Sequence, residues 1–386
     1  MRMALLGGGL QGQACLLDWL GQPDVTEILV LDSDVARLEA LRARFPDPRI
    51  QTRKLEVSDP NELAAALRGS RVVFSAIPYF LNLAVTRAAI EAGVHMVDLG
   101  GNTDVVFSQR ALDRDAVANG CAIVPDQGLA PGLAGILAAH GLRDLSPGAT
   151  VRMRVGGLPQ HPTGTLKYAL VFSIHGLLNE YAGDAVGLER GEITRQPTLT
   201  GLEPITFAAP VGQCEAAYTS GGTSTLPWTL QSRVRELDYK TVRYPGHWEK
   251  MAFLKELGFL ETELLSLGRQ KIEPRDVLAR VLEPLLSVPE VRDLVVLRVT
   301  VEGELGGRSV RREYEMIDFF DEATGLTAMM RTTAFPASET ALMLARGVIT
   351  ERGVLAAESV VPGEEYIGAL RRRGLPLQVT EEVGAL

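Results

Sequence analysis

The sequence predicts an α/β fold: a Rossmann-type, doubly wound parallel sheet followed by a second domain of the α+β class. Short apolar runs alternate with helical patterns over the first 127 residues. A glycine-rich turn follows the first apolar run, which is where doubly wound sheets bind dinucleotides. After residue 128 the pattern changes to strand-like runs with helices interspersed, and this change predicts the second domain.

Length and composition describe an ordinary globular protein of about two to three domains. The chain has 386 residues, of which 46% are hydrophobic and 23% charged. The formal net charge of −9 argues against phosphate-driven binding of nucleic acid. No uninterrupted apolar stretch reaches membrane-spanning length, and the apolar N-terminal run breaks at Gly7-Gly8-Gly9, which argues against a signal peptide.

Cysteine usage points to a reduced compartment. Cys15, Cys121 and Cys214 are far apart and odd in number, so neither a disulfide framework nor a zinc site is indicated. No group of Cys, His and acidic residues has metal-ligand spacing, and no G-x-S-x-G turn signals a serine nucleophile. We therefore expect a cytoplasmic protein without a metal, a membrane segment or a nucleic-acid partner.

The first domain is expected to span residues 1–127. Its predicted strands are 3–6, 27–31, 50–55, 71–76, 95–98 and 121–125. Helical patterns separate them at about 14–20, 34–44, 61–67, 82–92 and 105–119.

The turn after the first strand fits the pattern G-x-G-x-x-G. Gly7 allows the tight turn, Gly9 lets the backbone approach a pyrophosphate, and Gly12 lets the helix pack closely on the strand. The N–H groups of that helix's first turn, including those of Leu10 and Gln11, are available for phosphate. The alternative is a glycine-rich turn without a ligand.

Asp32 ends the second strand, 20 residues after Gly12. An acid at this place accepts hydrogen bonds from the adenosine ribose and repels a 2′-phosphate, which favours NAD over NADP. Ser33 and Arg37 lie nearby and are able to help hold a phosphate, so NADP stays open.

Further cofactor contacts are expected where strands end, because ligands of open parallel sheets bind beyond the carboxyl ends of the strands. These positions are Ala76, Ile77, Pro78, Asp98, Gly100 and Asn102, with Asp59 as an adenine-edge residue. Asp126 also sits at such an end. Ordinary turn chemistry is the alternative explanation for each, since Asp, Asn and Gly are common in turns.

The second domain is expected at 128–335, with the remaining segment 336–386 returning to the first domain. Its predicted strands are 151–155, 205–207, 215–218, 295–301 and 314–319, and its helices are 130–142, 166–180, 249–267 and 275–286, with a loop at 156–159. The final segment is predicted to form helices at 338–346 and 362–373 and a strand at 377–379. We expect the active site in a cleft between the domains.

Several segments in order along the chain resemble the saccharopine dehydrogenase-like family. They are Asp98 to Asn102, Asp126 to Gly132, Gly156 to Pro159, Phe172-Ser173 with Gly176 to Tyr181, Thr219 to Gly222 with Thr225 to Pro227, and Asp238 to His247. The likeness is greatest to those members that oxidise the ε-amine of L-lysine. One departure is Ser220, where the family pattern Thr-Asp-Gly-Gly has an acid.

The resemblance implies NAD-dependent oxidation of the lysine ε-amine to 2-aminoadipate 6-semialdehyde, with release of ammonia. The semialdehyde cyclises to piperideine carboxylate, since its α-amine reaches the aldehyde. It also implies a homodimer or larger homo-oligomer, and places Gly156, Gly157 and Tyr181 among the substrate-binding residues. Saccharopine or a carboxynorspermidine-like precursor remains an alternative substrate, and an NAD-binding sensor without turnover is an alternative from another class.

Amine oxidation by hydride transfer sets the demands on the remaining residues. The amine must lose its proton, although the pKa of a lysine amine is about 10.4. The segment from Tyr239 to His247 brings together Lys240, Arg243, Tyr244 and His247. We expect Arg243 to clamp the substrate carboxylate and His247 or Lys240 to handle protons, with Tyr244 among the substrate contacts. Glu180 and Asp126 are candidates for the α-ammonium or for the general base. Structural roles compete for all of them.

Overall fold

The six strands predicted for the N-terminal third all form, and they lie in one parallel sheet. They are β1 (Arg2–Leu6), β2 (Glu27–Asp32), β3 (Ile50–Lys54), β4 (Val72–Ser75), β5 (His95–Asp98) and β6 (Ala122–Val124), joined by β17 (Gly353–Val354). The order β17-β6-β5-β4-β1-β2-β3 is that of a doubly wound sheet, so the predicted fold class is confirmed.

The computed structural model describes residues 1–288 and 291–385, and the chain divides into two units. The first unit comprises Met1–His140, Ser224–Thr229 and Met330–Leu375, and the second comprises Gly141–Thr223, Leu230–Met329 and Pro376–Leu386. The expected third segment, 336–386, is therefore divided, because its last strand belongs to the second unit.

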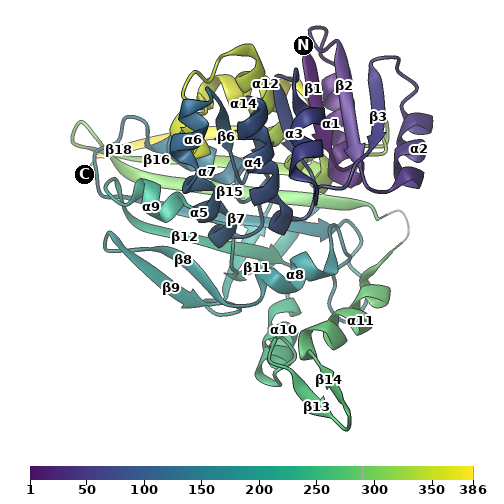
Figure 1. Cartoon of the computed structure of the whole chain (residues 1–386). Helices are drawn as coiled ribbons and strands as arrows, with labels where there is room; N and C mark the ends of the chain where they lie inside the picture. The colour runs from purple at the N-terminus through teal and green to yellow at the C-terminus, as the bar shows by residue number, and fades with distance from the viewer. Residues whose placement is uncertain (289–290, 386) are drawn as a thin grey trace. The chain divides into compact units, whose positions relative to one another are not determined.

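Helices cover both faces of the first sheet. The helices that lie wholly or mostly in the first unit are α1 (Leu10–Leu20), α2 (Val35–Arg44), α3 (Pro60–Leu67), η1 (Tyr79–Leu81), α4 (Asn82–Ala92), α5 (Thr103–Arg110), α6 (Asp113–Ala118), α7 (Leu133–Leu142), α9 (Leu226–Leu230), α12 (Ala328–Arg346), α13 (Ala357–Val360) and α14 (Gly363–Arg372). Figure 1 shows α3, α4 and α6 on the near side of the sheet. No helix of the described residues is long and apolar enough to cross a membrane.

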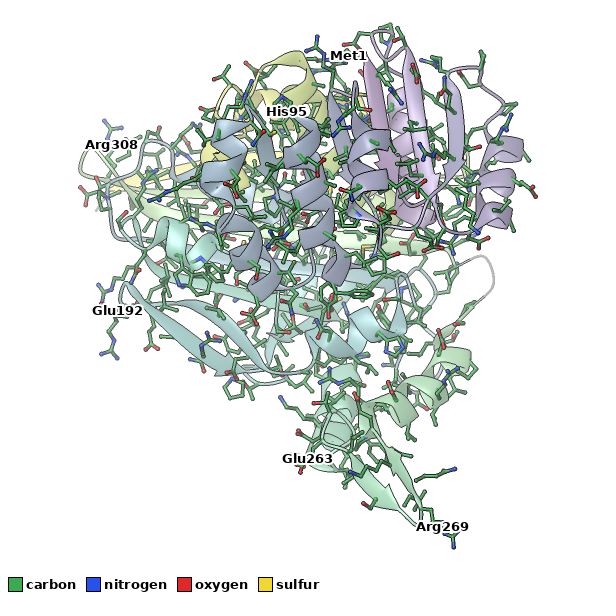
Figure 2. The ribbon with its side chains drawn as sticks, in the orientation of Figure 1. Met1, His95, Glu192, Glu263, Arg269 and Arg308 are labelled. Atoms are coloured by element: carbon green, nitrogen blue, oxygen red, sulfur yellow. The ribbon has the colours of Figure 1, made fainter. Side chains whose placement is uncertain are left out.

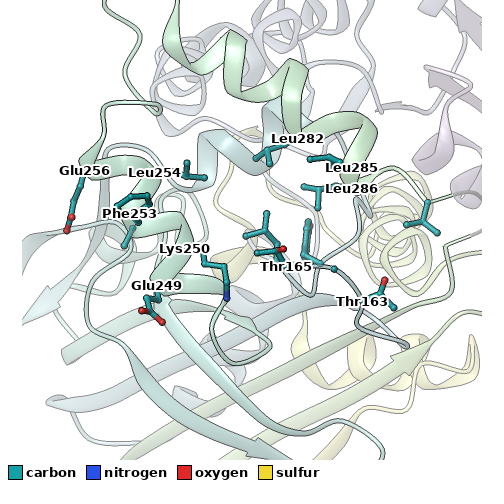
Figure 3. Close-up of a pocket in the computed structure, with 15 residues that line it drawn as sticks. Thr163, Thr165, Glu249, Lys250, Phe253, Leu254, Glu256, Leu282, Leu285 and Leu286 are labelled. Atoms are coloured by element: carbon teal, nitrogen blue, oxygen red, sulfur yellow. The ribbon is translucent and has the colours of Figure 1, made fainter.

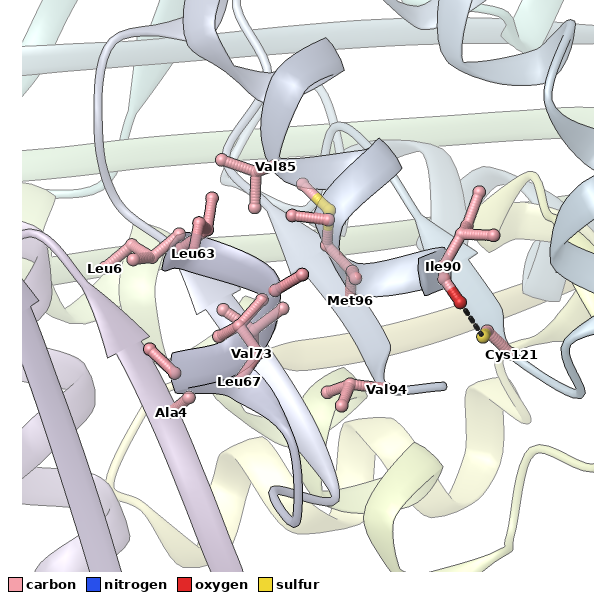
Figure 4. Close-up of a cluster of buried hydrophobic side chains, with 14 of the residues drawn as sticks. Ala4, Leu6, Leu63, Leu67, Val73, Val85, Ile90, Val94, Met96 and Cys121 are labelled. Atoms are coloured by element: carbon pink, nitrogen blue, oxygen red, sulfur yellow. Dashed lines mark hydrogen bonds between the residues drawn. The ribbon is translucent and has the colours of Figure 1, made fainter. Parts of the chain in front are cut away.

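The core of the near face joins α3 and α4 to the sheet (Figure 4). Leu63 and Leu67 of α3 and Val85 of α4 pack against Leu6 and Val73 of the central strands. On the other face, Trp19 of α1 meets Phe74 edge to face at 6.1 Å. Packing on both faces holds the central strands β1 and β4 in place, and with them the glycine loop that follows β1.

The second unit is built on a nine-stranded mixed sheet. Its strands are β7 (Ala149–Pro159), β8 (Asp184–Glu189), β9 (Glu192–Pro197), β10 (Glu203–Phe207), β11 (Gly212–Tyr218), β12 (Val234–Arg243), β15 (Asp293–Leu305), β16 (Arg308–Phe319) and β18 (Gln378–Ala385). The main order is β10-β11-β12-β7-β15-β16-β18, with β8 pairing β12 and β9. β12 and β7 are parallel, and β18 pairs along β16 in antiparallel register.

Three helices and a small hairpin complete this unit. They are α8 (Ile174–Glu180), α10 (His247–Glu256), α11 (Pro274–Leu286) and the hairpin of β13 (Leu265–Leu267) and β14 (Gln270–Ile272). Figure 2 labels Arg269 at the turn of this hairpin. Leu177 and Leu178 of α8, Trp248 and Met251 of α10, and Leu278 of α11 share one core cluster.

Several predicted boundaries differ from the structure for local reasons. The helix expected at 166–180 is only Ile174–Glu180, because Ser173 caps it by accepting the N–H of Gly176 at 3.1 Å. The helix expected at 249–267 ends at Glu256 and is followed by the β13–β14 hairpin. The loop expected at 156–159 continues strand β7, and the helix expected at 105–119 is split into α5 and α6.

Candidate functional site

The glycine loop after β1 has the shape that a pyrophosphate requires. Gly7 has a φ of +92°, and a Cβ at Gly12 would lie 1.9 Å from the carbonyl oxygen of Gly7. A Cβ at Gly9 would meet nothing within 4 Å, so this backbone borders open space. Gly9 is also the N-cap of α1 and makes no side-chain cap, which leaves the helix end available to an anion. The residues present therefore fit a dinucleotide.

Asp32 is held in place at the end of β2. Its Oδ2 accepts the N–H of Gly8 at 2.8 Å, and its Oδ1 accepts the N–H of Asp34 at 2.9 Å. The guanidinium of Arg37 approaches Oδ2 at 3.3 Å, with half of the Arg37 side chain exposed. The carboxylate thus joins β2 to the glycine loop, and an exposed cation lies beside it.

The other expected cofactor residues have local partners. Asp59 and Asn102 cap α3 and α5 by accepting backbone N–H groups of the first turns. Asp98 is fully buried, and its carboxylate accepts three N–H groups, from Gly100, Asp126 and the side chain of Gln109. These bonds are the turn and cap chemistry that competed with ligand binding in the sequence.

Residues Ala76 and Ile77 lie directly beside the glycine loop. A Cβ at Gly7 would be 2.7 Å from the carbonyl oxygen of Ala76 and 3.1 Å from the Ile77 side chain. Pro78 follows as the N-cap of η1. The end of β4 therefore borders the loop, as the motif requires.

Asp126 is the unusual acid of the first unit. It is 5% exposed, has a φ of +57°, and its Oδ1 has no hydrogen-bond partner among the described residues. A Cβ at Gly100 would be 1.6 Å from this oxygen, so only glycine fits at that position. Burial, reinforced by the negative Asp98, raises the pKa of Asp126 to about 7. A carboxyl with this pKa exchanges protons near neutrality.

In the second unit, Arg243 lies in an aromatic cage formed by Tyr168, Tyr181 and Trp248. Its guanidinium carbon is 4.7 Å from the ring centre of Tyr168, 5.9 Å from that of Tyr181 and 5.8 Å from that of Trp248. Arg243 ends strand β12 and is 2% exposed. Nearby Tyr181, Tyr168 and Glu180 outweigh burial and raise the pKa of Arg243, so it stays charged.

Glu180, Tyr181 and His247 surround the same guanidinium. Nε of Arg243 donates to the Tyr181 hydroxyl at 3.1 Å, and Nη2 faces Oε2 of Glu180 at 3.4 Å. The Tyr181 hydroxyl is 2.9 Å from Nε2 of His247. The Glu180 side chain is one-third exposed, and the partial loss of solvent around its carboxyl raises the pKa of Glu180 to about 7 despite the opposing pull of Arg243. Four of the predicted site residues therefore meet in one cluster.

Lys240, Tyr244 and Gly156 lie apart from this cluster, on the other face of the sheet. Alternation along β12 separates Lys240 from Arg243, and the register pairs Lys240 with Arg154. Nζ of Lys240 donates to Glu203 at 2.6 Å and to the carbonyl of Gly201 at 2.7 Å. The grouping expected for Lys240 and Arg243 fails because a strand, unlike a short turn, sends these side chains to opposite faces.

Tyr244 and Gly156 have packing roles on that face. The Tyr244 hydroxyl donates to the carbonyl of Pro159 at 3.0 Å, within a core cluster with Val242 and Leu158. A Cβ at Gly156 would be 2.4 Å from the carbonyl oxygen of Val242. Gly157, one residue later, lies instead on the Arg243 face, where Met329 and Val171 border it.

Sequence reasoning missed Tyr168 and Trp248, although they form two walls of the cage. Tyr168 falls in the segment that was expected to be helical, and Trp248 follows His247 directly. The available signal concerned Trp248: it lies in the first turn of α10, shortly after Arg243 at the end of β12. No group of three or more His, Cys, Asp or Glu residues in the described chain has the geometry to hold a metal ion.

A cavity of about 930 Å³ lies beside the segment that carries Tyr168 (Figure 3). It is lined by Thr163 to Leu166 and by side chains of α10 and α11, among them Phe253, Leu282 and Leu285. Lys250, which also lines it, donates to the carbonyl of Gly246 at 2.6 Å. The lining is mostly apolar, in contrast to the charged surroundings of Arg243.

Comparisons with known proteins match both parts of the chain. Residues 3–124 match the saccharopine dehydrogenase NADP binding domain, and residues 128–375 match the saccharopine dehydrogenase C-terminal domain. The mitochondrial alpha-aminoadipic semialdehyde synthase of Rattus norvegicus is 24% identical over 81% of this chain and 34% of its own length. The saccharopine dehydrogenase [NADP(+), L-glutamate-forming] of Schizosaccharomyces pombe is 24% identical over 72% of this chain and 63% of its own length.

The fold is also that of a solved structure. Apo saccharopine dehydrogenase (L-Glu forming) from Saccharomyces cerevisiae has a TM-score of 0.81 to this chain, with 20% identity and 99% of both chains covered. The chain spans 34% and 63% of the two curated relatives, so their activities do not transfer directly.

Proposed function

Because this chain belongs to the saccharopine dehydrogenase family of oxidoreductases, we propose that it oxidises the ε-amine of L-lysine with NAD as hydride acceptor, a lysine 6-dehydrogenase activity. The observation that carries the proposal is the pair formed by Arg243 and Glu180, 3.4 Å apart. An α-amino acid carries a carboxylate and an ammonium on one carbon. An Arg and a Glu held side by side are complementary to these two groups.

The substrate head group would replace the contact between these two side chains. The carboxylate binds the guanidinium of Arg243, which the aromatic cage keeps in place. The ammonium binds Glu180, whose side chain is one-third exposed and therefore reachable. Lysine, ornithine and saccharopine share this head group. Ornithine has a shorter side chain than lysine, and saccharopine carries a second, dicarboxylate arm on its side-chain nitrogen. The space available beyond the head group therefore decides the substrate.

Chemistry at the ε-carbon needs a proton acceptor. The neutral amine loses a hydride from C6 and becomes an iminium, and water then adds to give the semialdehyde and ammonia. When bound, the nicotinamide accepts the hydride. Among the four proton-transfer candidates, we propose Asp126 for this role, because its pKa of about 7 and its unpartnered oxygen suit the transfer.

We propose NAD as the cofactor on the basis of Asp32. Its anionic carboxylate at the end of β2 disfavours a 2′-phosphate. The matching family domain is described as NADP binding, and Arg37 at 3.3 Å from Asp32 supplies a cation that NADP would use. NADP is therefore the alternative that the assay must include.

We further propose that the protein is a homodimer. Large apolar side chains are exposed on α10, the β13–β14 hairpin and α11, namely Phe253, Leu257, Leu265, Leu267, Val281 and Leu285. Exposed apolar groups of this size on one region are typical of an association surface. We propose that the same surface of a second copy of the chain covers these side chains in the homodimer.

The deciding assay measures NADH or NADPH absorbance after purified protein is mixed with either cofactor and one amine. The amines are L-lysine, saccharopine, ornithine and carboxynorspermidine, at alkaline pH. Reduction of NAD by lysine, with ammonia released in equal amount, is the expected result. Reduction by saccharopine with release of glutamate would replace the substrate assignment. Binding of NAD without turnover of any amine would favour the sensor.

A further inference from the structure

We infer that His247 and Tyr181 are positioning residues that fix the direction of the Arg243 guanidinium through a chain of hydrogen bonds, and this inference rests on the proposed function. The chain runs from Arg243 to Tyr181, from Tyr181 to His247, and from His247 to the carbonyl of Leu166. Each of the three side chains is at most 2% exposed. The three side chains of this hydrogen-bond chain are therefore shielded from bulk water.

The direction of every proton in this chain follows from its two ends. The carbonyl oxygen of Leu166 only accepts, so Nδ1 of His247, 2.9 Å away, carries the hydrogen. Burial and the positive Arg243 lower the pKa of His247 to about 3, so the ring is neutral and Nε2 has only a lone pair. The Tyr181 hydroxyl must then donate to Nε2.

The hydroxyl oxygen of Tyr181 consequently presents its lone pairs to Arg243. Nε–H of Arg243 donates to it at 3.1 Å, and Nη1 donates to the carbonyl of Val242 at 3.1 Å. These two bonds fix the plane of the guanidinium, while the ring of Tyr168, whose centre lies 4.7 Å from the guanidinium carbon, supports it from one side. The Nη2 edge, which faces Glu180, is the edge left for a substrate carboxylate.

A protonated His247 would break this arrangement. It would have N–H groups on both ring nitrogens, so Nε2 would donate to Tyr181 and turn the hydroxyl hydrogen toward Arg243. Because the only lone pair of the neutral ring is occupied by Tyr181, His247 has no acceptor left for a substrate proton. Its role is thus to hold the Arg243 cage, in place of the proton transfer that the sequence suggested.

The kinetic test compares L-lysine with 1,5-diaminopentane, which has the same terminal amine but no carboxylate. The variants are Y181F, H247A and H247Q, the last of which keeps an acceptor near Nε2. Y181F loses the hydrogen bond to the charged Arg243, and H247A leaves the Tyr181 hydroxyl without its acceptor. Both variants are therefore expected to raise KM for lysine about tenfold or more, with kcat nearly unchanged. H247Q should recover part of the loss.

The same variants should leave kcat/KM for 1,5-diaminopentane unchanged, since this amine does not use Arg243. If the diamine is not oxidised, its inhibition constant against lysine serves as the readout. Y366F is the matched control, because it removes the hydroxyl of another fully buried tyrosine, on α14 of the first unit. It should leave KM for lysine unchanged. A fall in kcat with both amines would make His247 a proton-transfer group and overturn the inference.

A second measurement does not depend on turnover. The ¹H–¹⁵N spectra of the five histidines should contain a neutral ring with hydrogen on Nδ1 that does not titrate between pH 5 and 8 and that is absent in H247A. His95 provides the contrast, because its Nδ1 accepts the N–H of Ala122 and its hydrogen is therefore on Nε2. A His247 with hydrogen on Nε2, or one that titrates near pH 6.5, would contradict the hydrogen-bond chain even if lysine proved not to be the substrate.

Discussion

The carboxylate of Asp32 lies 3.3 Å from the guanidinium of Arg37 and 2.8 Å from the backbone nitrogen of Gly8. One acid thus neutralises the nearby cation and also supports the glycine loop. We expect the choice between NAD and NADP to depend on whether the carboxylate of Asp32 or the guanidinium of Arg37 dominates the charge beside the adenosine ribose.

Replacing Asp32 by Ser should shift the preference toward NADP. The substitution removes the nearer of the two acids that pair with Arg37 and leaves only Asp34, at 3.8 Å, so the guanidinium becomes available to a 2′-phosphate. We expect the ratio of kcat/KM for NADP to that for NAD to rise about tenfold or more. The double variant D32S/R37A should lose this gain. If D32S leaves the ratio unchanged, neither residue determines the cofactor.

Replacing Glu180 by Gln should weaken the binding of lysine about tenfold, because the α-ammonium loses its ionic partner. The pKa of Glu180 is raised to about 7, so the carboxylate that binds ammonium forms only as the pH rises through 7. KM of the wild type for lysine should therefore fall between pH 6 and 8. KM of E180Q should lack this fall, and a KM that still falls in the variant would assign the titration to another group.

Replacing Asp126 by Asn should lower kcat/KM for lysine about 100-fold at neutral pH, the usual effect of losing a general base. The rise of kcat/KM with pH near pH 7, which we assign to Asp126, should be absent in this variant. A variant that retains full activity would remove Asp126 from the mechanism.

The same variant gives a stability test that needs no substrate. The folded pKa of Asp126 is raised to about 7 from an ordinary value near 3.8, so the folded state binds the extra proton between these pH values. Wild-type stability from this group is therefore lost as the pH rises from about 4 through 7. The melting temperature of D126N relative to wild type should increase over this window, and a constant difference would argue against the raised pKa.

Replacing Leu285 by Glu should dissociate the proposed homodimer. Leu285 is 71% exposed on α11, and a charge there would oppose the burial of this apolar surface. Sedimentation of the wild type should give about twice the chain mass of 41.7 kDa, and L285E should give one chain mass. V117E is the matched control, because Val117 is 50% exposed on α6. A dimer that persists in L285E would place the interface elsewhere.

The first unit was predictable because its signals are local. The glycine spacing, the acid 20 residues later and the alternation of apolar runs determine the parallel sheet and its loop. Asp59 and Asn102 show the limit of this reasoning, because the side chain that caps a helix and the one that touches a ligand occur at the same strand ends.

The second unit was harder because its site depends on long-range register. Lys240 and Arg243 were grouped by their closeness in sequence, yet an extended strand places them on opposite faces. Tyr168 reaches Arg243 from a segment 75 residues earlier, and no spacing rule predicts such a contact. The pKa values of about 7 at Glu180 and Asp126 arise from burial, which only the packed structure reveals.

The pairing of β18 with β16 has a practical consequence for handling the protein. Strand β18 covers the outer edge of β16, which is 12 residues long and alternates between buried and partly exposed side chains. A chain cut after Leu375 would leave that edge with unpaired N–H and C=O groups. Such an edge recruits other strands, so a chain trimmed at Leu375 to aid crystallisation should form aggregates, whereas a chain that keeps β18 should not.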